Sequence, residues 1–239
     1  MAKRLKNFQK MTTKDVFLSV YKACSEIPGK RGPEAGYLLW GHLTRCASLT
    51  QDFFASEYGG SNRKSSVLKE LFLSGLLHDI GKLFLPAELL LKKKLEKEDW
   101  PIIEKHVEKY YVENALEKKL GIDYKSVPHE IIDIGTKHHV LLDGTGYSGV
   151  QIDSMARFSE NKVLLTFMII DKFEAGTSFL RPWQPRKRYM QIFLELQEAM
   201  EKGQLDKTKI LSFFSFLFDD SITNLTCLPQ IVSGFYGRR

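Results

Sequence analysis

GLLHDIGKLFLP, residues 75–86, is the stretch that decides the fold. It closes a segment, residues 67–79, in which apolar side chains recur at helical spacing and leave little polar surface, so we expect a buried helix. The last two residues of that helix, His78 and Asp79, are polar. Because a buried polar group without a partner costs on the order of 1–3 kcal/mol, this pair needs partners from other parts of the chain.

The spacing of apolar residues is helical almost everywhere else, and strand-like alternation between turn signals is scarce. The sequence therefore predicts an all-α fold. Thr12 or Thr13 is the expected cap of the first helix, and the glycines and prolines of residues 28–33 break the helix. The expected helices run from that cap to about residue 24 and over residues 34–58, 67–79, 100–120, 129–137, 161–175, 189–202 and 211–218, with a short one after Pro86.

Two of these helices carry patterns that predict which face is buried. In the helix expected over residues 100–120, Ile102, His106 and Tyr110 fall four residues apart and would share one face. The last helix carries an aromatic stripe made of Phe213, Phe214, Phe216 and Phe218. We interpret this stripe as core or interface packing rather than a cofactor site.

The composition is that of a folded domain with a local excess of positive charge. Of 239 residues, 43% are hydrophobic and 27% are charged, which excludes collagen-like, disordered and low-complexity chains. The formal net charge is +6, but the first 32 residues hold eight Lys or Arg and two acidic residues, and the remainder is balanced. This excess could dock an acidic protein partner. It does not favour nucleic acid, which calls for a basic stripe across the fold.

Cysteine usage and hydropathy favour a soluble protein of the cytoplasm. Cys24, Cys46 and Cys227 are odd in number, widely spaced and without a CxxC pair, so we expect neither a disulfide framework nor a zinc knuckle. The basic N-terminus has no apolar stretch of a secretory signal behind it. The longest apolar run, residues 163–170, is far shorter than the roughly 20 residues of a spanning helix, so no membrane span is expected.

The positions of the histidines predict a metal centre. Five of the six lie on or at the ends of apolar segments, and two aspartates are placed similarly: His42, His78, His106, His138, His139, Asp79 and Asp171. One such histidine would be an ordinary hydrogen-bonded core residue, but seven buried polar groups are hard to satisfy that way. A divalent ion would satisfy them, because imidazole nitrogen and carboxylate oxygen are its usual ligands. His129 follows Pro128 at a helix start and is expected at the surface.

These segments resemble the HD superfamily of metal-dependent phosphohydrolases, and within it the HD-GYP cyclic-dinucleotide phosphodiesterases. Residues 75–86, followed by residues 89–106, resemble the HD motif, its lysine-containing linker and the helix of the third histidine. KHHVLLDGTGY, residues 137–147, is similar to the paired-histidine loop of the subgroup, and DKFEAGTSFLRPW, residues 171–183, to the segment of the last aspartate ligand. The resemblance covers residues 37–190, roughly two thirds of the chain.

The resemblance implies two divalent ions that share one carboxylate. It implies a first ion held by His42, His78, Asp79 and Asp171, and a second held by Asp79 with His106, His138 and His139. Iron or manganese is favoured because the ligands are nitrogen and oxygen without a thiolate; zinc, magnesium and nickel are the alternatives. A hydroxide shared between the ions would attack phosphorus in line.

Further residues are assigned to the substrate side of the site. The resemblance implies that Lys82 and Arg181 contact phosphate oxygens, with Arg181 bidentate. Asp143 would orient His138 or His139 from behind. The tight loop at Gly144 and Gly146 carries Tyr147, which could stack on a guanine or simply fill the loop.

The implied function is hydrolysis of a cyclic dinucleotide, cyclic di-GMP or cyclic GMP-AMP. Several positions depart from the family pattern: Val140 stands in place of a glutamate, Ser148 of a proline, Leu38 of the glutamate of three-metal members, and Val107 and Tyr110 of a proline and a glycine. They leave two ions but alter the loop beside the substrate. Two alternatives therefore stay open, a broader HD nucleotide phosphohydrolase and a non-catalytic cyclic-dinucleotide sensor.

The domain organisation is predicted from the same segments. Residues 1–33 form a basic N-terminal helix and arm, residues 34–202 the HD-GYP-like catalytic domain, and residues 203–239 a C-terminal helical extension packed on that domain. We expect the basic arm to act mainly as a solubilising segment, with docking of a protein partner as the alternative, and a homodimer is compatible with the sequence.

Overall fold

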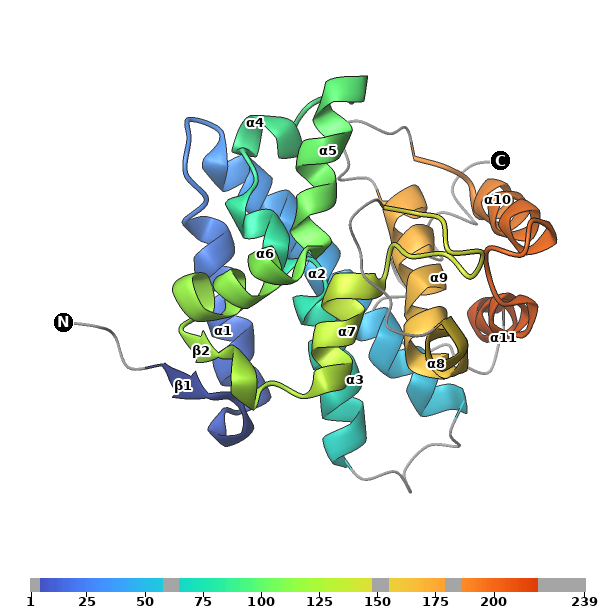
Figure 1. The fold of residues 1–239 in the computed structure, drawn as a ribbon, viewed down its shortest axis with the longest axis horizontal. Coiled ribbons are helices and arrows are strands. Elements are labelled where there is room, and N and C mark those ends of the chain that lie inside the picture. Colours follow the sequence, from blue (N-terminus) through green and yellow to red (C-terminus); the bar gives the residue numbers. More distant parts are fainter. Residues whose placement is uncertain (1–4, 58–64, 148–154, 179–185, 219–239) are drawn as a thin grey trace, which may run out of the picture.

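The computed structural model describes residues 5–57, 65–147, 155–178 and 186–218, and nearly all of its regular structure is helical (Figure 1). The helices are α1 (Thr13–Ser25), α2 (Gly32–Glu57), α3 (Ser65–Leu77), α4 (Ala87–Leu90), α5 (Trp100–Ile103), α6 (Lys109–Asn114), α7 (His129–Lys137), α8 (Met155–Glu160), α9 (Lys162–Thr177), α10 (Tyr189–Glu201) and α11 (Lys207–Phe218). Two-residue strands, β1 (Lys6–Asn7) and β2 (Ile122–Asp123), pair in parallel. The predicted all-α fold is confirmed.

The N-terminal helix α1 begins at the predicted cap. The Thr12 hydroxyl accepts the N–H of Asp15 (3.1 Å), and the Asp15 carboxylate accepts the N–H of Thr12 (2.9 Å), which is a capping box. Phe8, Val16 and Val20 are buried in the same apolar cluster as the first half of α2. These three residues of the N-terminal segment are therefore part of the core.

The single helix expected over residues 100–120 is wrong. The chain forms α5, a 3-10 turn at Glu104–Val107, then α6 and a π-helical turn at Ala115–Leu120. Glu108 is extended (φ −62°, ψ 136°), so the helix cannot continue through it. A 3-10 turn also turns the chain further per residue than an α-helix. As a result His106 is buried while Ile102 and Tyr110 are 41% and 65% exposed, and the three do not share a face.

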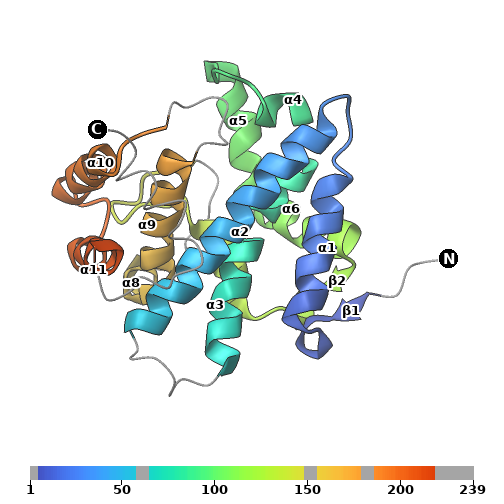
Figure 2. The same cartoon turned by 180° about the vertical axis from the view of Figure 1, so that it is seen from behind.

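Helix α2 lies between two apolar clusters. Figure 2 shows it crossing the molecule diagonally, with α1 and α3 on one side and α9 on the other. The first cluster joins α1, the first half of α2, α3 and the segments up to α7; the second joins the second half of α2 to α7, α8, α9, α10 and α11. Along α2, His42 lies between Leu39 of the first cluster and Cys46 of the second. Residues near the middle of α2 therefore lie at the boundary between the two apolar clusters.

Helices α2 and α3 approach each other most closely at a glycine. A β carbon on Gly75 would lie 2.6 Å from the Cα and 2.7 Å from the nitrogen of Ala47, too close for any side chain. The two helices run in opposite directions here. Their contact therefore brings His42, before Ala47, beside His78, after Gly75.

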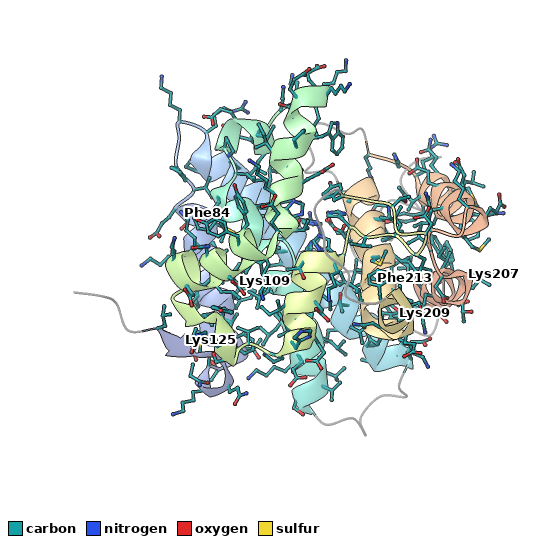
Figure 3. All side chains as sticks on the ribbon, in the orientation of Figure 1. Phe84, Lys109, Lys125, Lys207, Lys209 and Phe213 are labelled. Atoms are coloured by element: carbon teal, nitrogen blue, oxygen red, sulfur yellow. The ribbon has the colours of Figure 1, made fainter. Side chains whose placement is uncertain are left out.

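The C-terminal helices α10 and α11 cover α9. Phe213 contacts Phe173 of α9 with ring centroids 5.3 Å apart, and Figure 3 shows Phe213 between α9 and α11 while Lys207 lies on the outer side. Phe213, Phe214 and Phe216 are buried, so their interpretation as packing residues is confirmed, whereas Phe218 is 53% exposed. Across the described residues, every helix is too short or too polar to cross a lipid bilayer.

Replacing Gly75 by alanine tests the α2–α3 contact. The added β carbon overlaps the backbone of Ala47, so we expect a loss of about 1–3 kcal/mol in the free energy of unfolding, measured by urea denaturation. The control is Gly135→Ala, whose β carbon would meet Val112 at 3.4 Å. Equal stability of the two variants would contradict the close contact.

Candidate metal centre

The histidine–aspartate pair lies just beyond the C-terminus of α3. Helix α3 ends at Leu77, and His78 and Asp79 precede a 3-10 turn at Ile80–Phe84. Both side chains are buried, with 0% and 1% exposure. The Nδ1 atom of His78 meets the carbonyl of Gly75 at 2.8 Å, which turns Nε2 away from the helix. The sequence prediction that this helix buries two polar residues at its end is confirmed.

A first ligand group surrounds one oxygen of Asp79. His42 Nε2 lies 3.1 Å from His78 Nε2, 3.2 Å from Asp79 Oδ2 and 3.2 Å from Asp171 Oδ1. His78 Nε2 lies 3.3 Å from Asp79 Oδ2 and 3.6 Å from Asp171 Oδ1. Atoms bound about 2.0–2.2 Å from one ion lie roughly 3 Å apart when they are neighbours. These four atoms therefore have the spacing of ligands that share an ion.

A second ligand group surrounds the other oxygen of Asp79. Asp79 Oδ1 lies 2.9 Å from His106 Nε2 and 3.5 Å from His138 Nε2. With His139, one ligand atom of each of these four residues falls within 4.8 Å of all the others. Asp79 is the residue common to both groups. The structure thus brings together all seven side chains that the sequence assigned to a metal centre.

Unsatisfied atoms test whether a cation fits here. Among the residues that the structure describes, Asp79 Oδ1, His106 Nε2 and His138 Nε2 are fully buried and make no hydrogen bond. Three such atoms facing one another would be costly if nothing bridged them. A divalent ion would bind all three at once, because neutral imidazole nitrogens and carboxylate oxygens are its ordinary ligands. The donor set therefore fits a metal ion in the second group, and by its spacing in the first.

Main-chain carbonyls orient three of the imidazole rings. The Nδ1 atoms of His78, His106 and His138 lie 2.8, 2.6 and 2.8 Å from the carbonyls of Gly75, Ile103 and Ile134. A carbonyl only accepts hydrogen bonds, so Nδ1 carries the proton in each ring and Nε2 presents its lone pair to the site. These carbonyls belong to the last turns of α3, α5 and α7.

His42 is oriented by a side chain that the sequence analysis missed. Its Nδ1 donates to a carboxylate oxygen of Glu174, and Arg45 contacts the other oxygen at 2.5 Å. Glu174 stands three residues after Asp171 on α9, and Arg45 three residues after His42 on α2. A charged residue one helical turn from each ligand is the sequence signal that could have found them.

Charge and burial set the protonation states. Burial raises the pKa of the Asp79 carboxyl, but the Lys82 ammonium that pairs with it and the neighbouring imidazoles outweigh burial and hold the pKa well below its usual range. Burial lowers the pKa of His106 to about 4 and that of His139 well below its ordinary value. At His78 the nearby carboxylates outweigh burial and raise the pKa. His106 and His139 are therefore neutral at pH 7, as metal binding requires.

A steric constraint explains why the HDIGK motif has a glycine at Gly81. A β carbon on Gly81 would lie 2.0 Å from the carbonyl oxygen of His106, so this position admits no side chain. The close approach joins the turn after Asp79 to the turn that carries His106. It explains how a histidine from a distant, broken helix reaches the bridging carboxylate.

The histidine pair is followed by the expected tight loop. Gly144 and Gly146 have φ of +79° and +117°, and a β carbon on Gly146 would lie 2.1 Å from the His139 carbonyl. The Tyr147 ring packs on His139 with centroids 4.2 Å apart and planes at 30°, and lies 5.9 Å from His106. Tyr147 therefore covers the outer side of the second ligand group.

Asp143 does not play its expected part. Its side chain is exposed, and its carboxylate accepts hydrogen bonds from the N–H (2.9 Å) and hydroxyl (2.5 Å) of Thr145. Asp143 therefore closes the glycine loop, and the carbonyl of Ile134 takes the role of orienting His138. Arg181 lies outside the described residues.

The residues that depart from the family pattern have defined surroundings. Val140 is 3% exposed and belongs to the second apolar cluster, so packing replaces the expected carboxylate there. Leu38 packs against the first cluster. Val107 is buried and Tyr110 is exposed. Ser148 lies outside the described residues.

Cys46 lies beside the first ligand group but behind a ring. Its Sγ is 3.7 Å from His42 Nδ1, the nitrogen that faces Glu174, whereas Nε2 faces the ligands. Burial raises the pKa of the Cys46 thiol to about 11. The sulfur nevertheless lies within 4.8 Å of ligand atoms of His42, His78 and Asp171.

Comparison with known proteins agrees with this arrangement. Residues 44–208 match the sequence model of the HD domain family, which starts just after His42. Over 193 residues, 79% of this chain and 33% of the relative, the chain is 28% identical to the 3′3′-cGAMP-specific phosphodiesterase 2 of Vibrio cholerae. Over 170 residues, 69% of this chain and 35% of the relative, it is 28% identical to phosphodiesterase 1 of the same name and organism.

A third relative carries a different substrate name. The chain is 32% identical over 117 residues to a cyclic di-GMP phosphodiesterase of Pseudomonas aeruginosa, covering 47% of this chain and 25% of that protein. The chain thus spans between a quarter and about a third of the length of these curated relatives.

Replacing Gly81 by alanine tests the path that brings His106 to Asp79. The β carbon must push the two backbones apart, so His106 Nε2 moves away and the second ligand group weakens. We expect one of two Mn²⁺ positions, measured by calorimetry on metal-free protein, to lose about 10- to 100-fold in affinity. Gly135→Ala is the control, and two unaltered positions in the Gly81 variant would refute this role.

Proposed function

Because the chain belongs to the HD domain family, we propose that it is a metal-dependent phosphodiesterase that hydrolyses a cyclic dinucleotide, cyclic di-GMP or cyclic GMP-AMP. The observation that carries this proposal is Asp79, whose two carboxylate oxygens face two separate groups of histidine and aspartate ligands. The substrate class is supported by the names of the similar phosphodiesterases. The identity of the two bases in the cyclic dinucleotide, two guanines or a guanine and an adenine, belongs to the same proposal.

The seven side chains of the two ligand groups would hold two ions. The first would bind His42, His78, Asp79 and Asp171, and the second Asp79, His106, His138 and His139. When bound, such a pair would polarise phosphoryl oxygens and lower the pKa of water toward neutrality. We favour iron or manganese over zinc, magnesium or nickel, because the ligand atoms that face the centre are nitrogen and oxygen.

The remaining residues of the site would bind and shield the substrate. Lys82 places its ammonium beside Asp79 and would pair with a phosphate oxygen of the substrate, and Arg181 would contact a second one. Tyr147 offers an aromatic ring next to His139 for a base to stack on. Phe167 packs against His78, with centroids 4.9 Å apart, and excludes water from the inner wall.

We also propose a cellular location and keep three predictions about domains and partners. We place the protein in the cytoplasm, since Cys24 and Cys46 are buried free thiols. The division at residues 33 and 202, a protein partner for the basic N-terminus and a homodimer remain predictions.

Substitution of the bridging carboxylate tests the function directly. Metal-free protein is reloaded with Mn²⁺ or Fe²⁺ without oxygen and incubated with each cyclic dinucleotide, and linear product is followed by chromatography. Asp79→Ala removes a ligand of both ions, so turnover should fall by more than about 100-fold, beyond the loss typical of an outer contact. Asp133→Asn, whose carboxylate pairs with Lys137 (2.7 Å), is the matched control. Intact turnover in Asp79→Ala would reject the two-metal assignment.

A substrate panel distinguishes the alternatives, which the buried Val140 keeps open by altering the loop after the histidine pair. We expect cyclic dinucleotides to be hydrolysed faster than nucleoside monophosphates and linear dinucleotides. Preference for monoesters would instead indicate a broader nucleotide phosphohydrolase. Tight calorimetric binding of a cyclic dinucleotide without product would indicate a sensor.

A further inference from the structure

We propose that Glu174, held by Arg45, positions His42 and thereby sets the metal affinity of the first ligand group, while the second ligand group does not depend on it. The inference rests on the two-ion part of the proposed function. It assigns Glu174 and Arg45 as positioning residues, since neither is a ligand in the groups described above.

The need for Glu174 follows from where His42 lies. In the interior of a helix each carbonyl already accepts the N–H four residues later, and only the last four carbonyls stay available. His78, His106 and His138 each follow a helix end, and their Nδ1 atoms reach carbonyls of the last helical turn; the Ile134 carbonyl also accepts the N–H of His138. His42 lies inside α2 (Gly32–Glu57), and its Nδ1 takes its acceptor from another element. Glu174 of α9 supplies that acceptor.

Arg45 fixes the Glu174 carboxylate. One carboxylate oxygen accepts from His42 Nδ1, and the other accepts from Arg45 Nε at 2.5 Å. A second guanidinium nitrogen of Arg45 donates to the hydroxyl of Ser178 at 3.0 Å. Glu174 is 3% exposed, so a buried carboxylate here needs its guanidinium partner. Both oxygens are therefore engaged by different donors, which leaves the carboxylate a single orientation.

One turn of α9 contacts both nitrogens of the His42 ring. Asp171 Oδ1 lies 3.2 Å from Nε2, and Glu174, three residues later, contacts Nδ1. Since a carboxylate accepts, Nδ1 carries the proton and Nε2 keeps its lone pair toward Asp79 and Asp171. Without Glu174 the proton on Nδ1 loses its carboxylate acceptor, and Cys46 Sγ lies 3.7 Å from the same nitrogen. The ring would then present Nε2 to the first ligand group only part of the time.

The effect should be confined to one of two ions. Removing a carboxylate that orients a ligating histidine typically lowers metal affinity 10- to 100-fold. In the second ligand group the rings of His106 and His138 take their orientation from main-chain carbonyls, which the substitution leaves in place. The first position should therefore weaken while the second keeps its affinity.

The experiment is a titration of metal-free full-length protein with Mn²⁺ alone, followed by calorimetry and by the electron paramagnetic resonance of the bound ion. Wild-type protein should bind two ions per chain. In Glu174→Ala one position should weaken about 10- to 100-fold. In Glu174→Gln and Arg45→Lys the same position should weaken less, because part of the hydrogen bonding remains. At one Mn²⁺ per chain these variants should give the resonance of an isolated ion rather than of a coupled pair.

The control is Glu113→Gln, another carboxylate with a buried oxygen, whose ion pair is with Lys109 (3.6 Å). It should leave both Mn²⁺ positions unaltered. Equal weakening at both positions, or at neither, in the Glu174 variants would overturn the positioning role. Thermal melting of the metal-free variants identifies any that do not fold; should Glu174→Ala fail, Glu174→Gln and Arg45→Lys decide by the same criterion.

Hydrolysis is measured separately on the same samples. Wild-type protein that binds two Mn²⁺ without cleaving cyclic dinucleotides would reject the proposed function and leave the positioning role standing on the binding data. Variants with wild-type Mn²⁺ binding would reject the positioning role alone.

Discussion

The structure depends on one buried carboxylate. Asp79 is 1% exposed, and a lone ionised carboxyl at such depth would be too costly to keep. Its neighbours offset that cost: Lys82 forms an ion pair with it, and imidazoles from α2, from the turn after α5 and from the end of α7 converge on its two oxygens. Elements far apart in the sequence must therefore pack around this residue, and the long α2 and the buried α9 form the frame that holds them.

Glycines control how closely these elements approach. Gly75 lets α3 touch the backbone of α2, and Gly81 lets the turn after Asp79 touch the carbonyl of His106. Gly146 does the same for the loop beside the histidine pair. At each of the three positions a β carbon would lie within 3 Å of main-chain atoms, closer than real contacts allow. The spacing of the imidazoles is thus set by backbone contacts, and the apolar clusters on either side keep the elements pressed together.

Much of this could be predicted from the sequence, for a physical reason. Buried histidines and aspartates interrupt long apolar helices, and such interruptions are visible without coordinates. The break at Glu108 could not be predicted, because it follows from tertiary packing around His106 rather than from local propensity. Glu174 was missed because a glutamate on an apolar helix looks the same in sequence whether it is solvated or buried. Asp143 was misassigned although Asp before Gly commonly closes its own turn.

Some ligand imidazoles are oriented by main-chain carbonyls and one by a side chain, and this difference determines which substitutions can disturb the metal centre. Three rings are steered by carbonyl groups that every amino acid possesses, so substitutions at Gly75, Ile103 or Ile134 cannot delete the acceptor, whatever else they disturb. The acceptor of the His42 ring is instead a side chain, so a substitution at position 174 can remove it. Random substitutions should therefore affect the two ligand groups unequally. The first ligand group, to which α2 contributes His42, would lose the orientation of a ligand sooner than the second.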